Sequence, residues 1–193
     1  MAIDLLYKMD SATFHYHKTV DGIAPASIQE LRLAAIWHDA VYIPRFAYNE
    51  EASAKAFEHV LVQTYIPGHQ LPFRIPVVKR LIEQTTLRHH LCSELALDFN
   101  VPRDVRPLLD ADLASLAEDY EGFVLNQKRI VLEQTGKWCG LHKLGESAKW
   151  LKALISCRKH LFHTHVARDL FETRACDNIA KFIEEVAEAE ATL

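Results

Sequence analysis

The chain has 193 residues, of which 49% are apolar, and a formal net charge of -4. This length and apolar content suffice to bury one hydrophobic core without disulfide support. The slight acidic excess argues against a dedicated nucleic-acid surface, because phosphate neutralisation requires a basic face. The four cysteines are widely spaced, and neither a signal peptide nor a membrane-spanning segment is apparent. We therefore expect a cytoplasmic protein with reduced thiols and no membrane partner.

Scarce glycine and apolar residues at three- and four-residue spacing predict an all-α protein with a single domain over residues 1–193. A short first helix is expected around residues 5–6. A second helix over residues 14–21 ends near Gly22 and Pro25. On this second helix, His17 and Asp21 are four residues apart and project from the same side.

The next helix carries the stretch around which the chain is organised. Ser27 and Glu30 form a capping-box pattern, which predicts a helix start just before Leu31. This helix continues into His38 and Asp39, a polar pair inside an otherwise apolar run. A carboxylate in such surroundings costs several kcal/mol unless it is paired or coordinates a metal. The pair is therefore either a buried hydrogen-bonded couple or the nucleus of a metal site.

The helices that follow carry further polar residues. Asn49 is expected to cap a helix whose first turn holds Glu50 and Glu51. Pro76 is expected to lie in the first turn of another helix, which runs to His89 and His90. Further on, an apolar stripe at helical spacing predicts that Asp112 faces inward and Asp110 lies nearer the flank. The stripe consists of Val105, Leu108, Leu109, Asp112 and Leu116. The remaining helices are expected over residues 120–133, 146–161 and 166–190, with the Glu-rich end forming a solvated face.

Four of these predicted helices each offer a histidine or an aspartate. A metal held by side chains from facing helices is a well-attested arrangement in helical bundles. A single buried histidine or aspartate is, however, more often a hydrogen-bonded structural residue than a ligand. The residues alone leave both interpretations open.

Two segments of the chain carry distinctive motifs. Residues 35–42 read Ala-Ile-Trp-His-Asp-Ala-Val-Tyr, and residues 49–54 read Asn-Glu-Glu-Ala-Ser-Ala. With these motifs the chain resembles the predicted metal-dependent phosphohydrolases of the HD superfamily. Later segments continue the resemblance: Thr86 to His89 is similar to a Thr-x-x-His element, and residues 109–113 to a Leu-Asp-x-Asp-Leu element. Residues 172–178 resemble a closing Glu-x-x-Ala-Arg-x-Asn element. The match spans nearly the whole chain, and the Asn-Glu-Glu-x-Ser-Ala segment is its most specific part.

The resemblance implies an HD-type helical bundle with a divalent metal in its core. His38, Asp39 and Asp112 fall on the ligand positions of the family. The first ligand differs, because Asp21 stands where the family has histidine. Three alternatives follow: Asp21 ligates through oxygen, His17 takes over as ligand, or the site has lost its metal. We favour retention of the metal and leave open whether Asp21 or His17 is the replacement ligand. Cys176 in place of the family's arginine is a second departure.

The implied function is hydrolysis of a phosphoester, with a nucleotide as the expected substrate, by attack of a metal-bound water. Glu50 and His89 are the expected catalytic residues, whereas Arg88, Lys18 and His17 are expected to bind the substrate. The metal is Mn, Mg, Fe, Co, Ni or Zn. Trp37, Tyr42 and Phe46 either stack on a base or belong to the core.

Two rival functions are compatible with the same residues. The departures at Asp21 and Cys176 favour a degenerate HD domain that binds a nucleotide or a partner without turnover. A two-iron oxygenase would need further histidine ligands, for which His89 and His90 are the only neighbours. A homo-oligomer is left open.

Overall fold

A computed structural model describes residues 26–44, 46–64, 70–86 and 101–192. All regular structure in these ranges is helical, which confirms the all-α prediction. These residues fall into two compact units, one formed by the described residues up to Asp112 and the other by those from Leu113 onward. The prediction of a single domain stays a prediction. Within the described ranges, none of the helices combines the length and the hydropathy needed to span a membrane.

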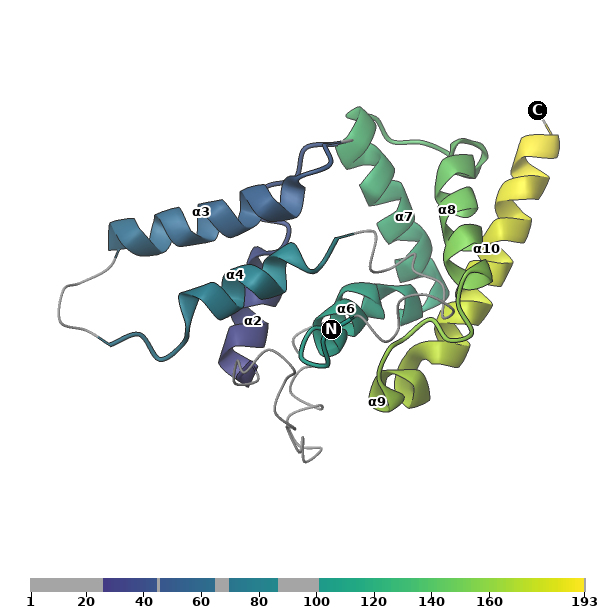
Figure 1. Cartoon of the computed structure of the whole chain (residues 1–193). Helices are drawn as coiled ribbons and strands as arrows, with labels where there is room; N and C mark the ends of the chain where they lie inside the picture. Colours follow the sequence, from purple (N-terminus) through teal and green to yellow (C-terminus); the bar gives the residue numbers. More distant parts are fainter. Residues whose placement is uncertain (1–25, 45, 65–69, 87–100, 193) are drawn as a thin grey trace. The chain divides into compact units, whose positions relative to one another are not determined.

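The first unit is built on three helices that contact one another. They are α2 (Ile28–Trp37), α3 (Asn49–Thr64) and α4 (Ile75–Glu83), and α6 (Arg106–Leu113) follows at the end of the unit. Helices α3 and α4 lie side by side, and α2 packs against both (Figure 1). Helix α4 begins with proline at its first turn as expected, but it ends at Glu83. The prediction that this helix extends through Thr85 and Thr86 is therefore wrong.

A buried carboxylate ties the start of α2 to the start of α4. The predicted capping box is confirmed: Glu30 accepts the Ser27 backbone N–H at 2.7 Å, and the Ser27 hydroxyl accepts the Glu30 N–H at 3.3 Å. The same carboxylate accepts the backbone N–H of Arg74 at 2.8 Å and its Nε and Nη2 donors at 2.9 and 2.8 Å. Glu30 is only 1% exposed. The Glu30 side chain therefore joins the first turn of α2 to the start of α4, through a residue 44 positions further along the chain.

The apolar run at the end of α2 is less buried than its composition suggests. Leu31 and Ala34 are buried, but Ile36 is 60% exposed. Trp37 contacts Phe57 of α3 edge-to-face with ring centroids 5.6 Å apart. Only one side of α2 thus faces the core, and the polar pair that follows lies at a partly exposed helix end.

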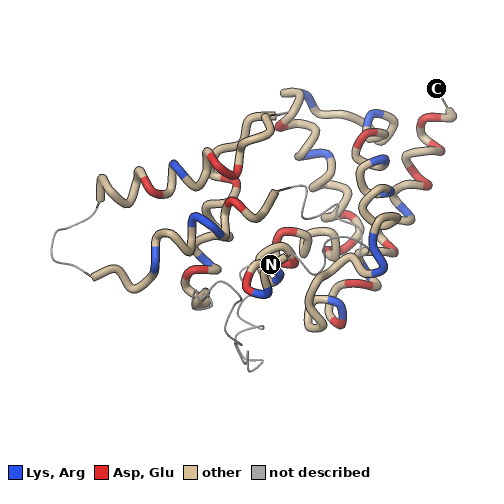
Figure 2. The backbone as a smooth tube through the Cα atoms, in the orientation of Figure 1, with Lys and Arg blue, Asp and Glu red and all other residues tan. Residues whose placement is uncertain are grey.

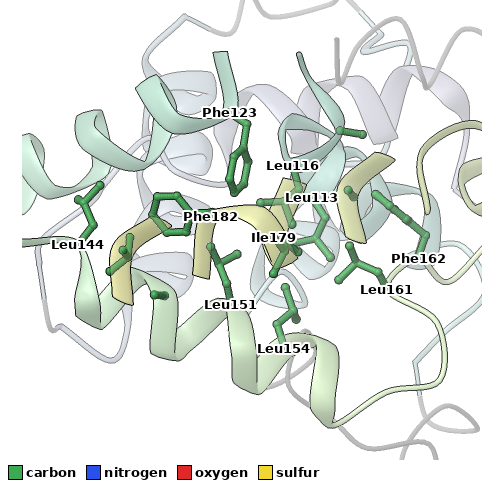
Figure 3. Packing of buried hydrophobic residues seen from close by; sticks show 14 of the residues in the cluster. Leu113, Leu116, Phe123, Leu144, Leu151, Leu154, Leu161, Phe162, Ile179 and Phe182 are labelled. Carbon is green, nitrogen blue, oxygen red and sulfur yellow. The ribbon is translucent and has the colours of Figure 1, made fainter. Parts of the chain in front are cut away.

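The second unit holds an apolar core among α7 (Tyr120–Thr135), α8 (Gly145–Ser156) and α10 (Thr173–Ala191). Helix α10 packs against both α7 and α8 (Figure 1). Phe182 of α10 meets Phe123 of α7 edge-to-face at 5.4 Å, and Leu151 of α8 lies beside them (Figure 3). Asn178, also on α10, donates to the backbone oxygens of Leu116 and Glu118 at 2.9 Å each. This amide satisfies carbonyls at the end of the 3-10 helix η1 (Ala114–Ala117).

The segment between α8 and α10 departs from the predicted boundaries. Helix α8 stops at Ser156, five residues before the expected end. A short helix α9 (His165–Ala167) and a π-helical turn η3 (Arg168–Glu172) then lead into α10. The two ends of this turn bind one loop: Glu172 accepts the N–H groups of Leu161 and Phe162, and the Nε of Arg168 donates to the Phe162 carbonyl at 2.7 Å. These bonds from Arg168 and Glu172 tie both ends of the π-helical turn to the loop at residues 161 and 162.

The C-terminal end of α10 is acidic, as the sequence predicts. Glu184, Glu188 and Glu190 are exposed, and Figure 2 shows acidic residues along the part of α10 that leads to the C terminus. The Oε1 atom of Glu190 lies at the start of α8, so close to Gly145 that a Cβ there would clash with it. The positive N-terminal end of the α8 dipole favours a carboxylate at this position.

Replacing Glu30 by glutamine should destabilise the first unit and remove a pH dependence. Although burial alone disfavours the carboxylate, hydrogen bonds from Arg74 and Ser27 lower the pKa of Glu30 from 4.5 to about 2. The carboxylate therefore stabilises the fold fully above pH 4.5, and this contribution is lost as the pH falls toward 2. Because Arg74 remains 41% exposed, we expect a contribution on the order of 2 kcal/mol.

Urea denaturation at pH 7 and pH 3 measures this effect. Glu30→Gln should lose most of the difference between the two pH values, whereas Glu146→Gln, which removes an exposed pair with Lys149, should not. An equal pH dependence in Glu30→Gln and wild type would refute the assignment.

Candidate metal centre

His38 is held in a defined orientation at the C-terminal end of α2. Its backbone N–H donates to the Ala34 carbonyl at 2.9 Å, so the residue continues the helix as its C-cap. Its ring Nδ1 lies 3.0 Å from the Ala35 carbonyl oxygen, which makes Nδ1 the donor in this bond. The Nε2 atom therefore points away from the helix. Histidine ligands in metal sites are fixed in the same way, by donating their second ring N–H to a carbonyl or carboxylate.

Two carboxylates converge on this Nε2 atom. Asp112 Oδ1 lies at 3.1 Å and Asp39 Oδ2 at 3.3 Å. Asp39 is in the turn that follows α2, closed by the Ala40 N–H to the Trp37 carbonyl at 3.1 Å, and Asp112 comes from α6. One donor atom from each of the three residues lies within 4.8 Å of the others. The structure thus brings together three of the four predicted metal ligands.

The cluster is more exposed than the sequence predicts. The side chains of His38, Asp112 and Asp39 are 18%, 31% and 63% exposed. The inward orientation expected for Asp112 is wrong: Asp110 is the fully buried aspartate, at 0% exposure. Nearly all of α6 is buried, since Leu108, Leu109 and Ala111 are at most 3% exposed. A stripe pattern cannot rank two aspartates on a helix that is buried on most sides.

The two carboxylates also favour a positive charge on His38. Burial opposes the charged form, but the hydrogen bonds and charges of Asp112 and Asp39 outweigh it and raise the pKa of His38 from 6.5 to about 10. The position at the C-terminal end of α2, where the helix dipole favours cations, acts in the same direction. At neutral pH the position between the carboxylates therefore carries a proton unless another cation replaces it.

Asn49 and Ser53 fix the loop that follows the cluster. The Ser53 hydroxyl accepts the Val41 N–H at 3.0 Å and donates to the Val41 carbonyl at 3.3 Å. The Asn49 amide pairs with Ile43 in the same way, with its oxygen 2.9 Å from the N–H and its nitrogen 3.0 Å from the carbonyl. Helix α3 does begin at Asn49, as predicted, but the Asn49 side chain bonds to the Ile43 backbone in the preceding loop. Sequence reasoning missed this role, although the four-residue spacing places both side chains on one side of the helix.

Other predicted site residues are not members of the three-residue cluster or fall outside the described ranges. Glu50 is in the first turn of α3 and is not one of the three residues of the cluster. Of the expected aromatic residues, Tyr42 and Phe46 are 46% and 44% exposed. The remaining predicted residues, His17, Lys18, Asp21, Arg88 and His89, lie outside the residues that the structure describes.

Comparisons with protein-family models, with curated proteins and with solved structures gave no match to this chain. Membership of the HD superfamily therefore stays a prediction.

In the absence of metal, His38 should remain protonated well above neutral pH. A folded-state pKa near 10 means that this proton stabilises the fold fully below pH 6.5, and that the contribution is lost as the pH rises toward 10. NMR titration of the ring in protein stripped of metal measures the value directly. Asp112→Asn should lower the pKa of His38 toward 6.5, because it removes the negative charge of a carboxylate that bonds to the ring. A wild-type titration near 6.5 would contradict the geometry.

Proposed function

We propose that the protein is a metal-dependent phosphohydrolase in which His38, Asp39 and Asp112 hold a divalent cation. The observation that carries this proposal is the fixed imidazole: its Nδ1 is committed to the Ala35 carbonyl, and its Nε2 lies between two carboxylates. One imidazole nitrogen and carboxylate oxygens form a donor set that suits Mn, Fe, Co, Ni or Zn. The same set is compatible with Mg when water completes the shell.

The charge of the cluster explains why a cation is needed before a phosphate can bind. Two carboxylates and a protonated His38 leave one net negative charge, which repels a phosphate. A divalent cation with neutral His38 removes this repulsion. When bound, such an ion supplies a Lewis acid and lowers the pKa of a coordinated water. The exposure of Asp39, at 63%, leaves the cluster open to a substrate from solvent.

The chain's own residues then have distinct tasks. His38 is oriented by its bond to Ala35, and Asp112 and Asp39 provide the negative charge that attracts the ion. Glu50 and His89 remain the proposed proton-transferring residues, and Arg88, Lys18 and His17 the proposed phosphate contacts. A nucleotide is the proposed substrate, and Asp21 the proposed fourth ligand. These assignments rest on the family resemblance.

Replacing the cluster residues should abolish metal binding and hydrolysis together. We expect His38→Ala and Asp112→Asn to weaken Mn²⁺ binding by at least about 100-fold, because each removes a proposed ligand that belongs to the three-residue cluster. Phosphate release from a panel of nucleotides and simple phosphoesters should fall to background in both variants. Metal content after purification without chelator, Mn²⁺ titration and phosphate release are the three measurements.

Matched controls separate these effects from general damage. His165→Ala and Asp169→Asn remove the same side-chain types from exposed positions in the second unit, and both should behave as wild type. Nucleotide binding without turnover in wild type would favour the degenerate binding module. Wild-type protein that neither binds a divalent metal nor releases phosphate would overturn the proposal.

A further inference from the structure

The three residues of the cluster are positioned by different means. His38 is fixed by α2 itself, through its backbone bond to Ala34 and its ring bond to Ala35. Asp112 is fixed by α6, a helix that is buried on most sides. Asp39 belongs to neither helix, since it lies in the turn after α2 and its side chain is 63% exposed. The orientation of Asp39 therefore depends on the loop that follows it.

That loop is anchored by the side chains of α3 described above. Ser53 pairs with both backbone polar groups of Val41, and Asn49 with both of Ile43. Ser53 is fully buried and Asn49 is 8% exposed, so water competes little for these bonds. The anchor at Val41 is two residues from Asp39, which leaves little freedom for the backbone between them.

We propose that Asn49 and Ser53 are positioning residues of the metal centre, which act through the backbone of residues 41–43 to hold the Asp39 carboxylate against the cation. This inference rests on the proposed function, because it requires that the cluster binds a metal. Asn49 and Ser53 lie outside the three-residue cluster and would therefore act on a bound metal only through the loop backbone. Outer residues that orient a ligand typically change metal affinity by about 10- to 100-fold.

Mn²⁺ affinity, measured by the electron paramagnetic resonance signal of free Mn²⁺, tests this role without relying on activity. Ser53→Ala leaves the Val41 backbone groups without their partner and should weaken Mn²⁺ binding about tenfold or more. Asn49→Ala should act in the same direction through Ile43. Thr85→Val is the matched control, because it removes another buried hydroxyl of the same unit, one that donates to the Ile82 carbonyl at 2.7 Å. It should leave the affinity within about twofold of wild type.

A double-mutant cycle distinguishes positioning of Asp39 from general destabilisation. If Ser53 acts through Asp39, then adding Ser53→Ala to Asp39→Asn should weaken Mn²⁺ binding little further than Asp39→Asn alone. Additive losses in the double variant would overturn the inference.

The remaining outcomes are also decisive. Wild-type protein that binds no Mn²⁺ contradicts the proposed function itself. Wild-type protein that binds Mn²⁺, with unchanged affinity in Ser53→Ala and Asn49→Ala, overturns only the positioning role. Circular dichroism checks the fold of each variant. Loss of the fold in both would make the two residues part of the folding framework and would equally overturn their assignment as positioning residues.

Discussion

The imidazole of His38 is the interaction on which the candidate site depends. It joins the end of α2, through the Ala35 carbonyl, to two carboxylates, one of which lies 74 residues further along the chain. Two negative charges and a helix C-terminus all favour a cation at the same point. The raised pKa of His38 assigns that cation to a proton on the ring in the protein alone. A divalent ion would satisfy the same groups, and its exchange for this proton is what we propose.

The first unit uses polar side chains to fix segments that form no regular structure. Glu30 accepts bonds from Ser27 and Arg74 and so joins the starts of α2 and α4. Asn49 and Ser53 each pair with the N–H and the carbonyl of one loop residue. Each of these side chains replaces backbone pairing that a helix or a sheet would otherwise provide. The result is a fixed route for the chain on both sides of His38 and Asp39.

Local patterns predicted much of this structure. The all-helical class, the capping box at Ser27 and the start of α7 at Tyr120 were readable from spacing and capping residues. The ion pair between Glu30 and Arg74 could not be predicted, because Arg74 lies in a segment distant in sequence. The ends of α4 and α8 were also predicted too late. Apolar periodicity continues past both ends. After α4 the Thr85 hydroxyl donates locally to the Ile82 carbonyl, and after α8 the backbone of Leu161 and Phe162 bonds to the distant Glu172.

The candidate site was predictable in composition but not in geometry. His38, Asp39 and Asp112 were expected to lie together, and the structure brings them within 4.8 Å. Their exposure was not expected, because an apolar neighbourhood in sequence does not fix which side of a helix faces solvent, as Ile36 illustrates. The role of Asn49 and Ser53 could not be assigned either, since a helix-start pattern accounts equally well for the same residues.

Whether a divalent cation replaces the proton at His38 is measured most directly by calorimetric titration of metal-free protein with Mn²⁺ at pH 7.5, repeated in buffers of different ionisation enthalpy. With the pKa of His38 near 10, close to one proton should be released for each Mn²⁺ bound. In His38→Ala that release should be lost together with the binding. Tight binding of Mn²⁺ to wild type without proton release, or binding that persists in His38→Ala, would contradict a metal centre at this cluster.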